Sequence, residues 1–495
     1  MDIKDLYTVP SSMFPLMPDK DTQLIPEILK FYKAQDVTEL HSLTKHTIAE
    51  FMTNVNSYYS NLIEGNKTNP LDIEKALKGE IIDEKKRLKV MENTAHIKTE
   101  KIIKKRIAEE PDLNIVSQEF ICFIHKTFYE NMPEEALNIN HNGREYKIVP
   151  GQLRTEEIKV GRHIPPYSKS LPDFLSTFEK FYNLDKKNDI QKIITFAASH
   201  QRLVWIHPFL DGNGRVARLF STAMACKLGI DEHGLWSISR GLAKYNKTYY
   251  AELENADSPR MGDLDGRGNL SEKMLVNFCK FFINTATDQI QFIKKVFEFE
   301  NFEKNMESLA LSVSDKKPAL AADYKLILTA VARRGEVPRG EIAEILRKPD
   351  RTAREILKKL IDKELLTSLT PRSGLRLNLP TQYAVLLFPK LFPQSEETEI
   401  LAAAEKNEVP ETIEEDSVKK KVEEAFSNLE SIYTDKKTEI LELRELCNYL
   451  EENEQLELIE ELSEKEGAPY DDIYDTVCEK LRSTLPNNDF RDERT

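Results

Sequence analysis

One short segment of the chain brings together residue types that handle phosphates and protons. It reads His207-Pro208-Phe209-Leu210-Asp211-Gly212-Asn213-Gly214-Arg215-Val216-Ala217-Arg218. A histidine can act as a general base, and an aspartate can hold a divalent cation beside phosphates. The two glycines allow a tight turn with close backbone approach, and the two arginines can each fork onto phosphate oxygens. The segment therefore predicts a site that holds a nucleotide phosphate and deprotonates an attacking hydroxyl.

The helices on either side must position this segment. The apolar stretch 188–206 predicts a buried helix that stops at His207, because the next residue is a proline. A second helix is expected over 215–228. Its free amides and its dipole would favour an anion at its start. Arg215 and Arg218 are three residues apart and share one face of this helix, so both can reach the same anion.

The whole chain is expected to be mainly α-helical and divided into several parts. Its 495 residues leave room for more than one domain. The pattern indicates an N-terminal segment (1–35), a helical region (36–310) that opens with a long helix (36–65), a second domain (320–390) and an acidic, helix-prone tail (396–495). Further helices of the first region are expected at 71–79, 84–109, 114–130 and 171–184.

Residues 143–166 interrupt the helical pattern with two short alternating stretches. These are 146–149 and 158–160, separated by Pro150-Gly151. Alternation bounded by turn residues is typical of strands. The segment therefore predicts a small β-hairpin close to the His207 segment in sequence.

The second domain has the pattern of a winged helix-turn-helix. Three short helices are expected before two strand-like stretches that flank a turn. Four cationic side chains lie on or beside the third helix, namely Arg351, Arg354, Lys358 and Lys359. In DNA-binding domains of this kind the third helix enters the major groove. Many winged helices instead dock proteins or dimerise, so DNA contact and protein contact both stay open.

Charge is divided unevenly along the chain. Residues 396–495 hold 31 acidic and 12 basic side chains, whereas the net charge of the whole chain is −14. Everything before the tail is therefore mildly basic, and the overall acidity does not argue against nucleic-acid contact.

The chain contains no apolar run long enough to span a bilayer and does not begin with a secretory pattern. Five scattered cysteines without a CxxC pair predict reduced thiols and a cytoplasmic protein.

The His207 segment resembles the signature of the Fic (filamentation induced by cAMP) family, HPFx[DE]GNGRxxR, at every fixed position. The stretch 154–166 looks like the flap hairpin of that family, and 249–253 looks like its adenine-side segment. The resemblance covers roughly 35–300. It implies a Fic-type helical core with a small β-hairpin flap.

This resemblance also implies an activity. A Fic enzyme is a protein adenylyltransferase, which transfers AMP from ATP to a Ser, Thr or Tyr hydroxyl of a protein, itself included, and releases pyrophosphate. The resemblance makes His207 the catalytic base and Asp211 the ligand of Mg²⁺. The ATP site that it implies comprises Asp211, Gly212, Asn213, Gly214, Arg215, Val216, Ala217, Arg218, Tyr249 and Tyr250. On the flap, Ile158, Lys159 and Val160 would pair with the backbone of the target protein.

A second motif indicates regulation. Ser60 to Gly65 fits the inhibitory motif [ST]xxxE[GN] of the family, and Ser60 and Glu64 share one helix face. We expect the Glu64 carboxylate to lie against Arg215 and to compete with the γ-phosphate for that guanidinium. Fic proteins of this inhibitory class often form homodimers. Two alternatives stay open: removal of AMP from modified proteins by a water that Glu64 activates, and a DNA-binding regulator or toxin-like module.

Overall fold

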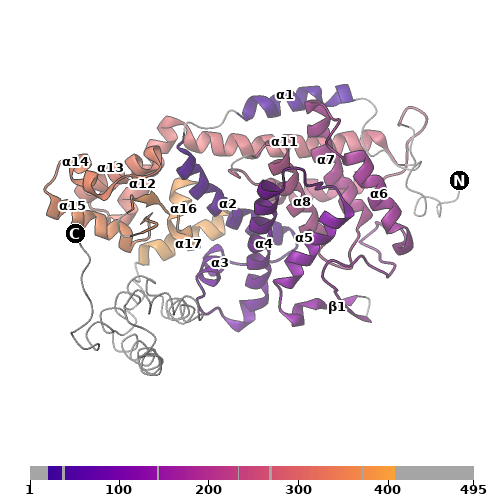
Figure 1. The fold of residues 1–495 in the computed structure, drawn as a ribbon, viewed down its shortest axis with the longest axis horizontal. Coiled ribbons are helices and arrows are strands. Elements are labelled where there is room, and N and C mark those ends of the chain that lie inside the picture. Colours follow the sequence, from indigo (N-terminus) through magenta and orange to yellow (C-terminus); the bar gives the residue numbers. More distant parts are fainter. Residues whose placement is uncertain are drawn as a thin grey trace, which may run out of the picture. The chain divides into compact units, whose positions relative to one another are not determined.

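The computed structural model describes residues 21–35, 40–141, 144–231, 234–266, 270–370 and 373–406, and these are mainly helical, as predicted (Figure 1). The helices are α1 (Ile25–Ala34), α2 (Ser42–Ile63), α3 (Pro70–Leu77), α4 (Glu84–Glu109), α5 (Gln118–Glu130), α6 (Leu171–Tyr182), α7 (Asp189–Ile206), α8 (Asn213–Lys227), α9 (Ile238–Lys244), α10 (Asn246–Ala256), α11 (Glu272–Phe297), α12 (Phe299–Val313), α13 (Pro318–Arg334), α14 (Ile342–Leu346), α15 (Asp350–Asp362), α16 (Thr381–Leu387) and α17 (Gln394–Lys406). The strands are β1 (Asn138–His141), β2 (Arg144–Lys147), β3 (Leu366–Thr367) and β4 (Arg376–Leu377).

Helix α2 is buried along most of its length. It begins at Ser42, later than the expected residue 36, because the ring of His41 caps it by accepting a hydrogen bond from the Leu43 amide. Residues 36–39 of the expected helix lie outside the described residues. The helix ends at Ile63, and Gly65 takes the left-handed backbone (φ +84°) that reverses the chain direction.

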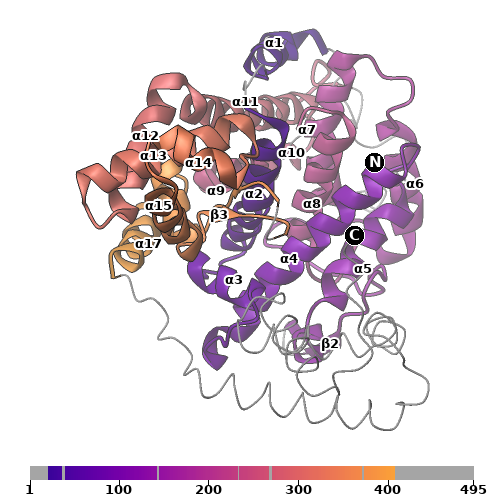
Figure 2. The same cartoon turned by 60° about the vertical axis from the view of Figure 1, so that its left-hand side comes forward.

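Four helices surround the His207 segment. Helix α8 packs against α4, α5 and α7, and α4 in turn packs against α2, so these helices lie together in both views (Figures 1 and 2). Helix α7 starts with a capping box, in which the side chains of Asn188 and Gln191 each bond to the other's backbone. It stops at His207, whose backbone is left-handed (φ 50°). The change of direction at His207 separates α7 from α8.

The sheet in this region differs from the expected hairpin. Strand β2, which contains Tyr146 and Lys147, pairs antiparallel with β1 before it, not with the stretch 158–160 after it. The flap stretch forms a single isolated bridge between Val160 and His163. Two alternating stretches close in sequence suggested the wrong pairing, because alternation marks strands but does not identify their partners.

Residues 318–377 contain the elements that the second-domain pattern predicted. Helices α13, α14 and α15 are followed by the antiparallel pair β3–β4, and Val337 forms an additional bridge with Leu375. The winged-helix interpretation stays a prediction. The described residues of 21–76 and 82–405 belong to one compact unit. The acidic tail is described only as far as residue 406, and 407–495 lie outside the described residues.

The segment after α16 holds the outer face of α2. The rings of Phe388 and Phe51 lie 6.0 Å apart, and those of Phe392 and Tyr59 are stacked at 6.3 Å. The Tyr59 hydroxyl donates a hydrogen bond of 2.6 Å to the carbonyl of Leu391. These contacts fix the last turns of α2, which carry Ser60 and lead into Glu64.

Among the described helices, none has both the length and the apolar run that crossing a bilayer requires.

Candidate active site

A hydrogen bond to the backbone fixes the tautomer of His207. Its Nδ1 lies 3.2 Å from the carbonyl oxygen of Val204. A carbonyl can only accept, so Nδ1 carries the ring proton and Nε2 keeps a free lone pair. Burial, the largest effect, lowers the pKa of His207 to about 4, and the nearby His163 lowers it further. The ring is therefore neutral at pH 7 and able to take a proton.

The loop after His207 is fixed from within. The ring of Phe209 is fully buried, and the side chain of Asn213 bonds to the Phe209 backbone twice. Its Oδ1 accepts from the Phe209 amide at 2.9 Å, and its Nδ2 donates to the Phe209 carbonyl at 2.8 Å. In this state the Asn213 side chain shapes the loop. Its contact with an α-phosphate, which the family resemblance implies, stays a prediction.

The first turn of α8 is closely covered by other side chains. Gly212 caps the helix with a left-handed backbone (φ 78°), which favours glycine, and a Cβ there would come within 2.8 Å of the Tyr129 hydroxyl. A Cβ on Gly214 would collide with the carboxylate of Glu64. The carboxylate of Glu64 therefore lies directly over the first turn of α8. The side chains of Val216 and Ala217 are buried in the core, and the Val216 amide donates to the Gly212 carbonyl at 2.9 Å, so these two residues support the helix.

Arg218 holds Glu64 in this position. Its side chain is 1% exposed and bonds to Glu64 Oε1 at 2.5 Å. It also donates to the hydroxyl and to the carbonyl of Ser60, each at 2.9 Å. We expected Glu64 to bind Arg215, and this expectation is wrong: Glu64 binds the guanidinium of Arg218 instead. The pairing of Ser60 and Glu64 on one face is what lets a single arginine bind both.

Arg215 is paired with two other carboxylates. It donates to Glu92 and to Asp211, each at 3.0 Å, and its guanidinium lies 5.0 Å from the ring of Phe128. Burial alone would lower the pKa of Arg215, but Tyr129, Asp211 and Glu92 raise it above its ordinary value. Asp211 also accepts a 2.7 Å bond from the Tyr129 hydroxyl. Burial would raise the pKa of Asp211, yet Arg215 and Tyr129 hold it below its ordinary value, so the carboxylate is ionised.

Arg154 anchors the flap (residues 154–166) to the backbone of His207. The buried guanidinium donates to the carbonyl of His207 at 2.9 Å and to that of Pro166 at 2.5 Å. Its backbone amide donates to the carbonyl of Pro208 at 2.9 Å. Arg154, at one end of the flap, thus ties the loop after His207 to the other end at Pro166. The three flap residues named from the sequence, Ile158, Lys159 and Val160, lie on the exposed or half-exposed part of this segment.

The two tyrosines expected at the adenine differ in position. Tyr249 is 1% exposed, and its hydroxyl bonds to Nε2 of His200 at 2.8 Å. Tyr250 is 47% exposed and donates to the carbonyl of Ile63, the residue before Glu64. Of the two, Tyr250 has the ring that a ligand could contact.

Glu92 and Tyr129 complete the site but have no distinguishing signal in the sequence. Glu92 lies on α4 and Tyr129 on α5, each about 80 residues or more from the arginine or aspartate that it binds. No spacing rule connects such positions, so only the packed structure reveals them.

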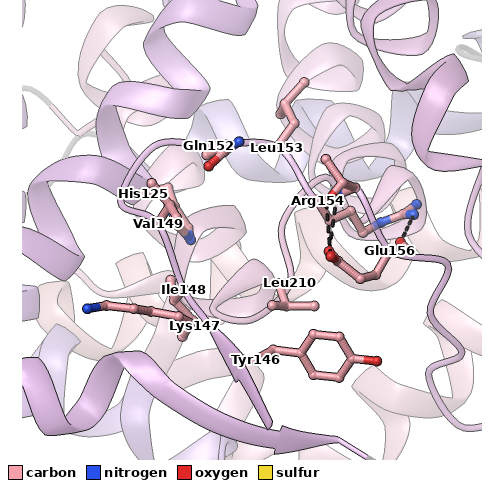
Figure 3. Close-up of a pocket in the computed structure, with 11 residues that line it drawn as sticks. His125, Tyr146, Lys147, Ile148, Val149, Gln152, Leu153, Arg154, Glu156 and Leu210 are labelled. Atoms are coloured by element: carbon pink, nitrogen blue, oxygen red, sulfur yellow. Dashed lines mark hydrogen bonds between the residues drawn. The ribbon is translucent and has the colours of Figure 1, made fainter. Parts of the chain in front are cut away.

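A cavity of about 230 Å³ opens beside the catalytic loop (Figure 3). Its walls are residues 146–149 on one side and 152–156 on the other, with Leu210 of the loop between them. His125 of α5 also lines it, beside Val149 (Figure 3). The cavity therefore adjoins both the base of the flap and the segment that follows His207.

Comparison with known proteins finds sequence similarity to one family. Residues 115–225 match the Fic/DOC family. Among curated relatives, Protein adenylyltransferase Fic of Drosophila mojavensis is 37% identical over 82 residues, which are 17% of this chain and 16% of that protein. The protein of the same name from Drosophila melanogaster is 35% identical over 82 residues, 17% of each chain. The matched stretch thus spans only about a sixth of these relatives.

Two solved structures with Fic in their names align with part of this chain. A Fic family protein from Desulfovibrio desulfuricans G20 aligns with a TM-score of 0.42 and 15% identity over 75% of this chain and 98% of that one. Fic-1 from C. elegans aligns with a TM-score of 0.40 and 17% identity over 56% and 71%. The match to the Fic/DOC family, residues 115–225, includes the whole segment from His207 to Arg218.

Proposed function

We propose that this protein is an autoinhibited protein adenylyltransferase, which transfers AMP from ATP to Ser, Thr or Tyr hydroxyls of proteins, itself included. The observation that carries the proposal is the contact of Glu64 with the first turn of α8. Its carboxylate lies over Gly214 and bonds to Arg218 at 2.5 Å, next to a neutral His207. A carboxylate there marks a seat for an anion, and it keeps a phosphate out.

The reaction requires displacement of that carboxylate. With Glu64 withdrawn, the first turn of α8 is open to the α-phosphate of ATP, which the amides of Gly212 and Gly214 would bind. Arg218 is then available to the β- and γ-phosphates, whereas Arg215 reaches them only by exchanging its bonds to Glu92 and Asp211. His207 Nε2 takes the proton of the target hydroxyl as its oxygen attacks the α-phosphorus. A new bond joins that oxygen to phosphorus, the bond from the α-phosphorus to the bridging oxygen breaks, and its electron pair leaves with pyrophosphate.

Mg²⁺ fits the residues at this site. Asp211 is ionised, and its Oδ2 accepts hydrogen bonds from Tyr129 and Arg215. The described residues contain no group of three acidic, histidine or cysteine side chains that could hold a metal. Mg²⁺ requires none, because it keeps several waters and binds through one or two carboxylates and the phosphates of its nucleotide. Held by Asp211, it would neutralise charge on the phosphates.

Glu64→Gly tests the proposal. The change removes the competing carboxylate and leaves Arg218 free, so AMP incorporation into the protein itself should rise by about 10-fold or more, within the range usual for regulatory coupling. Mass spectrometry after incubation with ATP and Mg²⁺ detects the AMP adduct on Tyr, Ser or Thr. The control is Glu64→Gly combined with His207→Ala, which should bind ATP and transfer nothing. Equal incorporation in the wild-type and Glu64→Gly proteins would falsify the autoinhibition, and absence of any AMP adduct in both would reject the activity.

A second candidate reaction is removal of AMP from modified proteins. It is favoured by the same carboxylate, because Glu64 lies where a base could activate water against a phosphodiester. Incubation of an AMP-modified protein with the wild-type enzyme, followed by chromatography for free AMP, separates the two. Release that depends on Glu64 favours removal, whereas none favours transfer.

The remaining proposals concern partners and setting. Helix α15 exposes Arg351, Arg354, Lys358 and Lys359, which suit DNA or an acidic protein surface.

A cytoplasmic setting accords with Cys122, Cys226 and Cys279, which are free. Burial raises the pKa of the first two thiols to about 11, so they are protonated and unreactive at neutral pH.

A further inference from the structure

The last turns of helix α2 are held from two sides. The aromatic pair Tyr58–Tyr59 directly precedes Ser60 on this helix. Because an α-helix has about 3.6 residues per turn, the pair faces away from Ser60 and Glu64. On the Ser60 side, a guanidinium of α8 bonds to both of these residues. On the aromatic side, the helix is covered by residues 388–392, which follow α16 and are called the 388–392 segment below.

The rings of the 388–392 segment make the cover tight. The ring of Phe392 stacks on that of Tyr59 at 6.3 Å and 10°, and it meets the ring of Tyr58 edge-on at 5.3 Å. Phe388 makes a similar contact nearer the start of α2, where its ring lies 6.0 Å from that of Phe51. All five rings are buried. Ring pairs of this kind contribute more than their buried area alone, so α2 loses favourable contacts if it moves away from the segment.

The carbonyl of Leu391 ties the segment to α2 and to α9 at once. It accepts a hydrogen bond from the Tyr59 hydroxyl at 2.6 Å and another from Arg240 of α9 at 3.0 Å. Arg240 also donates to the carbonyl of Lys390 at 2.6 Å and lies 3.9 Å from the ring of Phe292. Lys390 has a left-handed backbone (φ 67°), which is uncommon for a residue other than glycine. Arg240 therefore holds the segment in a turn that its own sequence does not favour.

The first turns of α2 are attached to the second domain as well. The Thr44 hydroxyl donates to the carbonyl of Ala332 on α13 at 2.7 Å. The hydroxyl oxygen of Thr47 lies 3.3 Å from the carbonyl of Leu377 on β4. One helix thus carries these contacts along its length and leads into Glu64 at its end. It connects the second domain with the first turn of α8.

The Glu64 carboxylate itself is open to competition. Its side chain is 37% exposed, although that of its partner Arg218 is buried. A partly exposed carboxylate contributes little by pairing alone, and the phosphates of ATP compete for the same guanidinium. The carboxylate can stay over Gly214 only while the end of α2 stays against α8. The position of the helix therefore matters as much as the ion pair.

We propose that the 388–392 segment, together with Arg240, is part of the inhibitory device: it holds the end of α2 against α8 and so keeps Glu64 over the first turn of that helix. Inhibition then depends on two sets of contacts, the bonds of Glu64 with Arg218 and the cover on the opposite face of α2. Movement of the segment releases the carboxylate without any change in the ion pair. This inference rests on the proposed function, because the reaction that is inhibited is adenylyl transfer.

Two substitutions loosen the segment and leave the residues of the site intact. Tyr59→Phe removes the hydroxyl that bonds to Leu391 and keeps the ring on Phe392. Phe392→Leu keeps an apolar side chain and removes the ring contacts. The matched control is Tyr32→Phe on α1, which also removes a tyrosine hydroxyl that donates to a backbone carbonyl, in this case that of Asp189 at 3.2 Å.

Incorporation of AMP into the protein itself, quantified by mass spectrometry, should rise about 5-fold in each of the two variants. That is the change expected from loss of one hydrogen bond or one ring pair. The combined variant should rise further, up to the level of Glu64→Gly. In the Glu64→Gly background the same substitutions should cause no rise, because no carboxylate remains to be released. Tyr32→Phe should match the wild-type protein.

Hydrogen–deuterium exchange supplies a measurement that does not depend on the chemistry. Amides of residues 57–66 should exchange faster in Tyr59→Phe and Phe392→Leu than in the wild-type protein or in Tyr32→Phe. Amides of α5, which the segment does not hold, should exchange at the same rate in all of them. Thermal unfolding of each variant identifies any that has lost its fold.

Three outcomes decide the matter. Unchanged AMP incorporation in both folded variants and in their combination overturns the inference. An equal rise in the Glu64→Gly background also overturns it, because the effect would then not act through the carboxylate. If Glu64→Gly transfers no AMP at all, the proposed function has failed. Exchange of residues 57–66 then decides whether the segment holds the end of α2, and unchanged exchange overturns that too.

Discussion

Two groups of arginines in this protein are treated in opposite ways. At the start of α8, Arg218 is 1% exposed and bonded to Ser60 and Glu64, and Arg215 is bonded to Glu92 and Asp211. On α15, Arg351 is 92% exposed and has only a loose contact with Glu355 in the next turn. The first group is bonded to protein carboxylates, which a ligand would have to displace. The second group is exposed to solvent, so a ligand could bind it without displacing a protein carboxylate.

The contrast shows where charge contributes to the fold. Removing one member of a buried pair leaves the other unpaired and is costly, whereas exposed pairs contribute about 0–1 kcal/mol. The site arginines are therefore structural as well as functional in the resting state. The cations of α15 contribute little to stability, so a ligand can bind them without unfolding anything.

The largest effect should come from acid, because the buried core contains titratable groups that α15 lacks. Burial lowers the pKa of the following histidines to about 3 or 4: His96, His125, His163, His200 and His207. An unfolded histidine has a pKa near 6.5, so between about pH 6.5 and 4 the unfolded chain binds more protons. Stability is then lost as the pH falls, by up to about 1.4 kcal/mol per pH unit for each histidine.

Two buried carboxyls oppose this trend in part. Burial raises the pKa of Asp231 and of Asp257 to about 7, so the folded state binds their protons first and gains stability as the pH falls below 7. The histidines outnumber them, and the net change is a loss. Urea unfolding at pH 7, 6, 5 and 4 measures it. A midpoint that stays constant down to pH 4 would contradict the expected balance.

Arg218→Ala should have the next largest effect. It removes a buried guanidinium and leaves Ser60 and Glu64 without their donor, at a cost of about 3 kcal/mol in the free energy of unfolding. The matched control is Arg354→Ala on α15, which should change stability by no more than about 0.5 kcal/mol. Chemical unfolding of the two variants side by side measures both. Similar losses in the two would mean that the contrast between the arginine groups is wrong.

Substitutions in α15 should have the smallest effect on stability. Their clearest effect should be on binding of a partner such as DNA. Arg354→Ala combined with Lys358→Ala should leave AMP incorporation and unfolding unchanged. If this helix contacts DNA, the variant should bind duplex DNA more weakly, with a smaller dependence on salt, in a gel shift with the full chain. A wild-type protein that shows no salt-dependent shift would remove DNA from the possible partners and leave protein docking.

Local features of the fold were predictable from the sequence. The range 84–109 coincides with α4, and the stretch 188–206 differs from α7 by one residue, because amphipathic spacing and capping residues act within a few turns. Pairing of β2 was not predictable in the same way. Residues 146–149 and 158–160 both alternate, but β2 pairs with residues 138–141, and the choice of partner depends on packing outside the segment.

By itself, the sequence determined the chemistry of the site, because the base, the glycine turn and the arginines lie within twelve consecutive residues from His207 to Arg218. It also indicated that Glu64 faces that site. Only the tertiary structure decided which guanidinium Glu64 meets. Arg218, rather than Arg215, faces α2, since Glu92 of α4 and Asp211 already occupy Arg215. Contacts between residues more than a hundred positions apart follow from how helices pack, and no spacing rule in the sequence encodes them.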